Sequence, residues 1–135
     1  MKNMKINLMS ILFVLYLGAL GTLCFLHGDH LPNITGTWMG FRADSVVHAA
    51  MFLPFIPLSF MSIGFMKPTF FKDMFLLLIM AAVGLCTAYG TEIIQGQLRY
   101  RTFELRDVAA DCVGLAAGSA FMTLCIIIKH LFKRR

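Results

Sequence analysis

Residues 101–111 have the sequence RTFELRDVAAD, which holds five charged side chains and leads directly into an apolar segment. That segment, about residues 108–128, has about the 21 residues that an α-helix needs to cross a hydrocarbon layer of roughly 30 Å. An Asp, Lys or Arg at the centre of such a helix costs about 2.5–3.5 kcal/mol. So many charges at one level of a small membrane protein therefore indicate a functional or a pairing role.

Three further apolar segments of similar length lie at about residues 6–26, 46–66 and 74–94. The chain is 59% hydrophobic and 14% charged, whereas a soluble domain is about half apolar and about a quarter charged. We therefore predict an all-α integral membrane protein, a four-transmembrane-helix bundle that forms one domain over residues 1–135. The first segment is expected to be a retained helix, because its apolar core exceeds that of a typical signal peptide.

Basic residues are distributed unevenly between the two sides that four helices would define. Eight lie on the side of both termini and four on the other side, namely Arg42, Arg99, Arg101 and Arg106. The positive-inside rule then predicts that both termini are cytoplasmic. Nucleic-acid binding is not expected, because the lysines flank helix ends and do not form a patch.

Polar residues recur at helical spacing together with small residues. Two stripes of this kind are Gly84, Ala88, Glu92 and Gln95 in the third segment, and Asp107, Asp111, Gly114 and Gly118 in the fourth. Small residues mark close packing of membrane helices, so the packing faces also carry the acids. Asp44 and His48 are four residues apart in the second segment and share a face. We expect these groups to form a buried polar cluster that opens outward.

Two further features concern local structure. Pro54 and Pro57 lie in the middle of the second segment and predict a kink there. Glycines and a proline in residues 27–42 favour turns over regular structure in the first external connection.

The order of these residues resembles the VanZ-like family of small bacterial membrane proteins. The family pattern has an Asp-Lys-x-x-His element, a Glu-x-x-Gln element, then Arg, Phe and Asp, and an Ala-Asn-x-x-Gly-x-x-x-Gly run. This chain has Asp44–Ser45–Val46–Val47–His48, Glu92–Ile93–Ile94–Gln95, Arg101, Phe103, Asp107 and Ala110–Asp111–Cys112–Val113–Gly114 with Gly118. Ser45 replaces the usual Lys, and Asp111 replaces the usual Asn and adds a negative charge.

The resemblance covers roughly residues 44–118. It implies a single VanZ-like domain in the bacterial inner (cytoplasmic) membrane, with several membrane passes. The family takes its name from a protein associated with resistance to the glycopeptide teicoplanin. This implies a cell-envelope setting more than a particular reaction.

Nine residues are candidates for ligand binding, and four of them, His48, Glu92, Asp107 and Asp111, are also candidates for catalysis. The nine are Asp44, His48, Glu92, Gln95, Arg99, Arg101, Arg106, Asp107 and Asp111. Structural alternatives stay open. Asp44 and Asp107 suit helix N-termini through the helix macrodipole. Glu92, near a helix C-terminus, would need a partner, and a buried ion pair with Arg101 or Arg99 would supply one.

Two functions remain open from the sequence. The favoured function is binding of an anionic envelope lipid or a lipid-linked glycan in an outward-facing pocket. The alternative is a membrane enzyme that acts on a phosphate-bearing lipid at the outer leaflet, with His48 and the acids as acid–base groups or as ligands of a divalent metal. Binding is favoured because the sequence has no nucleophile motif, P-loop or zinc signature. Catalysis, metal dependence and oligomeric state are left open.

Overall fold

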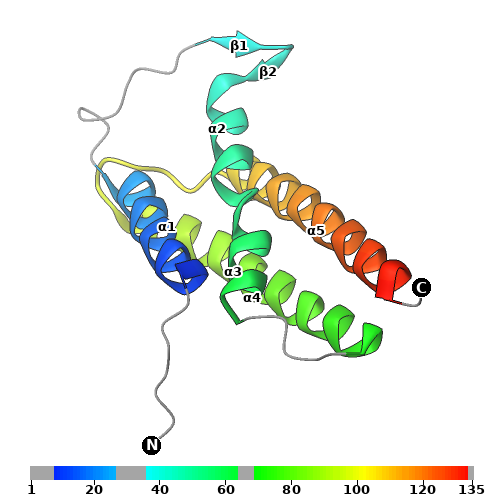
Figure 1. The fold of residues 1–135 in the computed structure, drawn as a ribbon. Helices are drawn as coiled ribbons and strands as arrows, with labels where there is room; N and C mark the ends of the chain where they lie inside the picture. The colour runs from blue at the N-terminus through cyan, green and yellow to red at the C-terminus, as the bar shows by residue number, and fades with distance from the viewer. Residues whose placement is uncertain (1–7, 27–35, 64–68, 134–135) are drawn as a thin grey trace, which may run out of the picture.

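The computed structural model describes residues 8–26, 36–63 and 69–133 (Figure 1). These residues form five α-helices and one small β-hairpin. Their order is α1 (Leu8–Phe25), β1 (Thr37–Trp38), β2 (Phe41–Arg42), α2 (Ala43–Phe52), α3 (Phe55–Ile63), α4 (Phe70–Gln97) and α5 (Leu105–Lys133).

Four helical segments are long and apolar enough to cross a membrane, and they confirm the predicted set of four long apolar helical segments. They are Leu8–Phe25, Ala43–Ile63, Phe70–Gln97 and Leu105–Lys133. The last two have 28 and 29 residues and extend past both predicted ends. At 1.5 Å per residue these helices are about 42 Å long, longer than the roughly 30 Å hydrocarbon layer. Asp73 and Asp107 lie in their first turns, where an acidic side chain stabilises the helix start.

The second of these segments is interrupted, as its prolines predict. Helix α2 ends at Phe52 and α3 begins at Phe55, with Leu53 and Pro54 between them. Proline has no N–H to donate and clashes with the preceding turn, so Pro54 ends the regular hydrogen bonding of α2. Pro57 lies in the first turn of α3, where a helix tolerates proline.

Contacts at the two ends of the bundle show that successive segments run antiparallel (Figure 1). At one end, the Ser10 hydroxyl on α1 donates to the Ser62 carbonyl on α3 over 3.0 Å. At the other end, the Tyr100 hydroxyl, just after α4, donates to the Phe25 carbonyl at the end of α1 over 3.0 Å. The first turn of α4 contacts the last turns of α5 through Asp73.

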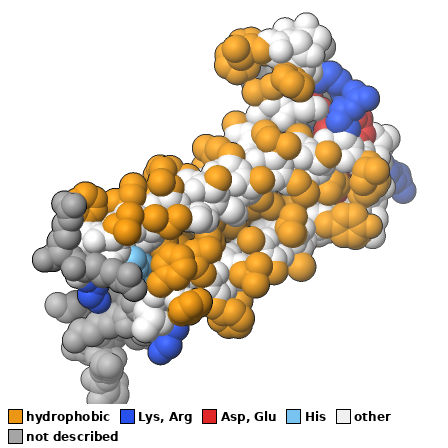
Figure 2. Space-filling view, turned by 90° about the vertical axis from the view of Figure 1, so that its right-hand side faces the viewer, with side chains coloured by type: hydrophobic (Ala, Val, Ile, Leu, Met, Phe, Trp, Pro, Cys, Tyr) orange, Lys and Arg blue, Asp and Glu red, His pale blue; other side chains and the backbone are white. Residues whose placement is uncertain are grey.

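The core lies where the broken segment packs against α1, α4 and α5. Its largest fully buried side chains are Phe52, Phe55, Ile56 and Phe60. Large apolar side chains also cover the outer surface, among them Val14 at 67% exposure and Phe75 at 64%. Figure 2 shows them over the middle of one face, with Lys, Arg, Asp and Glu gathered toward the ends. A surface of this kind suits hydrocarbon contact better than water.

Helix α5 approaches the broken segment through its two stripe glycines. A Cβ atom on Gly118 would lie 2.5 Å from the Leu53 carbonyl oxygen, and one on Gly114 would lie still closer to the Ala49 carbonyl oxygen. Both neighbours are backbone atoms, so a side chain cannot be accommodated by a rotamer change. The small-residue stripe of α5 therefore packs as predicted.

The turns expected before α2 include a β-hairpin, which the sequence analysis did not predict. Thr37 pairs with Arg42 and Trp38 with Phe41. The two residues between the strands, Met39 and Gly40, have φ values of 51° and 85°. Positive φ at both central positions suits a two-residue turn whose twist matches antiparallel strands. The earlier part of this connection, residues 27–35, lies outside the described residues.

Candidate functional site

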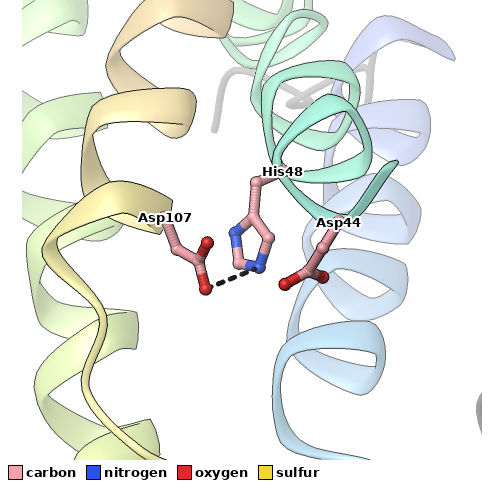
Figure 3. A group of neighbouring side chains, drawn as sticks. All are labelled: Asp44, His48 and Asp107. Carbon is pink, nitrogen blue, oxygen red and sulfur yellow. Dashed lines mark ion pairs between the residues drawn. The ribbon is translucent and has the colours of Figure 1, made fainter. Parts of the chain in front are cut away.

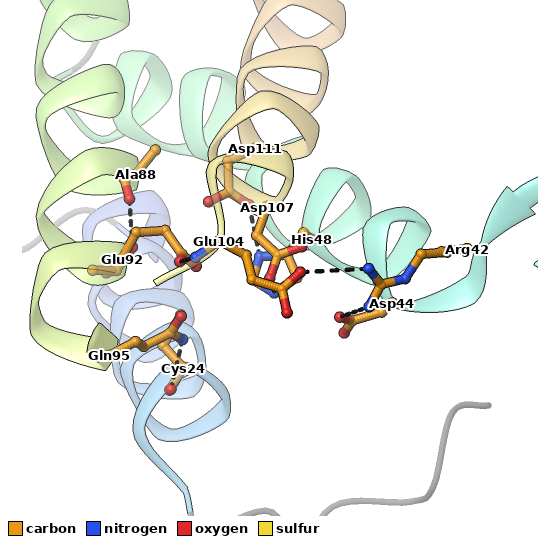
Figure 4. Close-up of polar contacts among 11 residues, drawn as sticks. Cys24, Arg42, Asp44, His48, Ala88, Glu92, Gln95, Glu104, Asp107 and Asp111 are labelled. Carbon is orange, nitrogen blue, oxygen red and sulfur yellow. Dashed lines mark hydrogen bonds and ion pairs between the residues drawn. The ribbon is translucent and has the colours of Figure 1, made fainter. Parts of the chain in front are cut away.

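Five ionisable side chains from three helices converge at the end of the bundle where α5 begins (Figure 4). We call them the polar cluster. Its members are Asp44 and His48 on α2, Glu92 on α4, and Asp107 and Asp111 on α5. Ligand atoms within 4.8 Å of one another form two groups, Asp44–His48–Asp107 and His48–Glu92–Asp111. The structure thus brings five of the nine predicted site residues together.

His48 lies at the centre of the polar cluster. Its Nδ1 atom is 3.1 Å from Oδ1 of Asp111, and its Nε2 atom is 3.6 Å from Oδ2 of Asp107. The two acids are four residues apart on one face of α5, so a single imidazole reaches both. Figure 3 shows that Asp107 and Asp44 flank the Nε2 edge of the ring.

Position along the helices separates the acids into two kinds. Asp44 and Asp107 lie in the first turns of α2 and α5, where the macrodipole favours a negative charge. Asp111 is one turn deeper and only 1% exposed, and His48 is 5% exposed. Helix capping therefore accounts for part of the role of the first two acids, but not for Asp111 or His48.

Glu92 is 1% exposed and lies near the end of α4. Its Oε2 atom accepts a hydrogen bond of 3.3 Å from the Glu104 backbone N–H. Its Oε1 atom has no hydrogen-bond partner in the described parts of the chain, and the same holds for Oδ1 of Asp107 and Oδ2 of Asp111. Buried acceptors without a partner are costly, so this arrangement needs a physical reason.

The structural alternative for Glu92, an ion pair with Arg101 or Arg99, is not found among the described residues. Within them, no arginine nitrogen lies within the 4.0 Å that defines an ion pair to Glu92. The connection between α4 and α5 folds back over the end of α4, so that a Cβ on Gly96 would lie 2.9 Å from Cβ of Phe103. This close approach brings the Glu104 N–H, and not a guanidinium group, to the Glu92 carboxylate.

The arginines around the polar cluster differ in their contacts. Arg42 lies 3.4 Å from Glu104 and 3.8 Å from Asp44, and all three side chains are partly exposed. Arg101 is half-buried, and Arg99 and Arg106 are exposed. None of these last three forms an ion pair within the described parts of the chain. Sequence analysis did not select Arg42, although its place two residues before Asp44 could have indicated it.

Gln95 belongs to the predicted stripe but bonds away from the polar cluster. It is 2% exposed, and its Nε2 atom donates to the Cys24 backbone carbonyl on α1 over 2.7 Å. The contact ties the end of α4 to the end of α1. This gives Gln95 a structural partner at the end of the bundle where the polar cluster lies.

A second ionic group lies at the opposite end of the bundle and was not predicted as a site. Asp73 is 2% exposed, and its Oδ2 atom is 3.1 Å from Nζ of Lys129 and 2.9 Å from Nε2 of His130. The acid lies in the first turn of α4, and the two basic groups lie near the end of α5. Each charge is thus at the helix end that favours it. Antiparallel pairing of these two helices could have indicated the contact.

Comparison of the chain with protein-family models, with curated proteins and with solved structures found no match in any of the three.

Proposed function

We propose that this chain is a VanZ-like membrane protein that binds the anionic headgroup of an envelope lipid or a lipid-linked glycan. The headgroup would lie beside the polar cluster, over the connection between α4 and α5. The observation that carries the proposal is the set of three arginines there that form no ion pair with the described residues. They are Arg99, Arg101 and Arg106.

Their chemistry supports a phosphate-bearing ligand. A guanidinium group presents a planar fork of donors that matches phosphate in a bidentate manner. Arg101 lies in the connection between α4 and α5 and is half-buried, whereas Arg99 and Arg106 are exposed. Its charge is partly removed from water, so an anionic partner stabilises it more than it stabilises the other two. Four carboxylates in the polar cluster repel an anion, which favours binding over the arginines and not among the acids.

The proposed setting is the bacterial inner membrane, with both termini cytoplasmic and the polar cluster on the outer side. The charge distribution supports this orientation. All six lysines and two arginines belong to the side of the termini, and four arginines belong to the side of the polar cluster.

Impermeant thiol reagents test the orientation in intact cells. In a chain freed of its own cysteines, a cysteine introduced at Gly36 or at Leu98 should be labelled from outside. A cysteine at Lys133 should be labelled only after the membrane is permeabilised, because the same rule places it inside. The reverse pattern would place the polar cluster on the cytoplasmic side and exclude an outer-leaflet headgroup.

Lipid-dependent stability tests the arginine site. The full chain in a neutral detergent should be stabilised by an anionic phospholipid such as phosphatidylglycerol and not by phosphatidylcholine. At a lipid concentration 100 times the Kd, the stabilisation is about 2.7 kcal/mol. We expect Arg101→Ala to remain folded and to lose most of the stabilisation by the anionic phospholipid. Arg101→Lys should also be impaired, because an ammonium group cannot bind phosphate in the bidentate geometry.

Lys72→Ala is the matched control, since it removes one exposed basic side chain at the opposite end of the bundle. It should keep the wild-type stabilisation. Equal responses of Arg101→Ala and the wild type would rule out headgroup binding by Arg101.

A metal-assisted or acid–base enzyme is the second candidate, and the position of His48 between Asp107 and Asp111 favours it. An imidazole oriented by one carboxylate can accept a proton from a reacting group. The two candidates separate in one assay. An enzyme would release headgroup or phosphate from the bound lipid, and His48→Gln would stop the release without weakening the binding.

A further inference from the structure

The inner part of the polar cluster has the composition of a metal site. His48, Glu92 and Asp111 each offer a ligand atom, and these atoms all lie within 4.8 Å of one another. The three residues come from three different helices and are 5%, 1% and 1% exposed. The packing of these three helices, and not the spacing of residues along one helix, thus brings the group together.

The unpartnered oxygens give a second and independent indication. Oε1 of Glu92 and Oδ2 of Asp111 are fully buried and have no hydrogen-bond partner among the residues that the structure describes. Within the described residues no Lys or Arg forms an ion pair with either carboxylate. Each carboxylate has one partner, the Glu104 N–H for Glu92 and the His48 imidazole for Asp111, and one buried oxygen of each is left unsatisfied, which is costly. A bound cation would neutralise both carboxylates and use these oxygens as ligands.

We propose that His48, Glu92 and Asp111 bind one divalent transition-metal ion of the Mn²⁺ or Zn²⁺ class. The ligand atoms are Nδ1 of the imidazole and one oxygen of each carboxylate. This inference goes beyond headgroup binding and does not depend on it.

The distances fit such an ion. Two ligand atoms that each lie about 2.1 Å from a metal are about 3.0 Å apart at a right angle and about 3.4 Å apart at a tetrahedral angle. The 3.1 Å contact between Nδ1 of His48 and Oδ1 of Asp111 is a hydrogen bond here. It already holds the two groups within this range, so that rotation of the carboxylate would turn the unpartnered Oδ2 atom to the metal. Small side-chain rotations would bring in Glu92, whose ligand atom is within 4.8 Å of both.

The other edge of the imidazole has a carboxylate close to it. When Nδ1 binds a metal, Nε2 carries the proton and donates it to a carboxylate or a carbonyl in most sites of this kind. Here Nε2 faces Oδ2 of Asp107 at 3.6 Å (Figure 3), an ion-pair distance that a small rotation of the carboxylate would shorten to a hydrogen bond. Asp107 is therefore a positioning residue, which orients the ring and does not itself touch the metal.

The inner group is a better metal site than the outer group of Asp44, His48 and Asp107. The Asp44 side chain is 44% exposed and forms an ion pair with Arg42 at 3.8 Å. That guanidinium group competes with a metal for the carboxylate, and water screens the attraction. The inner group is buried, and no Lys or Arg of the described residues forms an ion pair with its carboxylates.

The donor set selects the class of ion. One imidazole nitrogen and two carboxylates suit Mn²⁺, Zn²⁺ and Fe²⁺. Ca²⁺ prefers six to eight oxygen ligands, and Mg²⁺ keeps several of its waters. Three protein ligands also leave coordination positions open, which water or a phosphate oxygen could fill.

Titration of the purified full chain with Mn²⁺ tests the proposal. The protein is kept in neutral detergent without anionic lipid and treated with EDTA, and the free Mn²⁺ signal is followed by electron paramagnetic resonance. We expect one ion per chain, displaced by Zn²⁺ and not by Ca²⁺. Asp107→Asn should weaken binding about 10- to 100-fold, as loss of such an orienting partner does. Glu92→Gln and Asp111→Asn should weaken it at least as much.

Glu104→Gln serves as the matched control. It makes the same chemical change as Glu92→Gln at a partly exposed carboxylate whose side chain faces Arg42. This variant should retain the wild-type affinity. Folding is checked in EDTA, where Glu92→Gln should melt no lower than the wild type because it removes a buried charge.

Three results would overturn the proposal. The first is a wild-type chain that binds no Mn²⁺ saturably. The second is full affinity in a folded Glu92→Gln or Asp111→Asn variant. The third is an equal loss of affinity in Glu104→Gln, which would mean that Mn²⁺ is attracted only by the overall negative charge at this end of the bundle. Because the titration contains no anionic lipid, each result is independent of headgroup binding.

Discussion

Gly114→Ala is expected to lower the free energy of unfolding by about 3 kcal/mol, the upper end of the usual cost of overpacking. The added methyl group would meet the Ala49 carbonyl oxygen and lie 3.1 Å from the Leu53 backbone nitrogen. Neither atom can move aside without shifting α2 from α5. Thermal melting in neutral detergent, followed by circular dichroism, measures the effect.

Gly90→Ala is the matched control for this experiment. It makes the same substitution inside α4, where an added Cβ would have no neighbour within 4 Å. Alanine is a better helix former than glycine by about 0.8–1.0 kcal/mol in water, so this variant should melt at or above the wild-type temperature. Equal melting temperatures for the two variants would mean that α2 and α5 do not approach as closely as described.

Asp73→Ala is expected to cost about 3 kcal/mol, the lower end of the range for removing one partner of a buried ion pair. The loss leaves Lys129 and His130 without the carboxylate that both contact. The lower end applies because the Lys129 side chain is 30% exposed and can regain part of its hydration. Denaturation in a series of sodium dodecyl sulfate and neutral detergent mixtures measures the change.

Lys72→Ala is again a useful control, because it changes the adjacent residue at an exposed position. Surface substitutions of this kind usually stay within about 0.5 kcal/mol. If Asp73→Ala unfolded no more easily than Lys72→Ala, the contact between the ends of α4 and α5 would contribute nothing to stability.

The helical architecture was predictable because its cause is local. Apolar runs of membrane-crossing length specify helices wherever lipid removes other partners for the backbone. The break at Pro54 is equally local, since it follows from a missing N–H. The helix ends were harder, because α4 and α5 continue beyond their apolar parts into polar turns. The hairpin was missed because Met39 adopts a positive φ. Methionine is not one of the residues, such as Gly, Asn or Asp, whose presence in a sequence indicates such a turn.

The polar cluster was partly predictable from spacing. Residues four apart on one helix share a face, which placed Asp44 with His48 and Asp107 with Asp111. Contacts between residues of different helices depend on how the helices pack, and residue spacing within one helix does not predict them. The sequence suggested an arginine for Glu92, whereas the fold supplies the Glu104 backbone N–H.

The break between α2 and α3 has a consequence for how the protein is made. Pro54 and Pro57 deprive the carbonyls of Ala50 and Leu53 of their regular helical donors. In hydrocarbon such groups must be covered by another helix, and the Leu53 carbonyl faces Gly118 of α5. Because α5 follows α2, α3 and α4 in the chain, a ribosome makes the second segment before it makes α5. The Leu53 carbonyl therefore stays without its cover until α5 has been made.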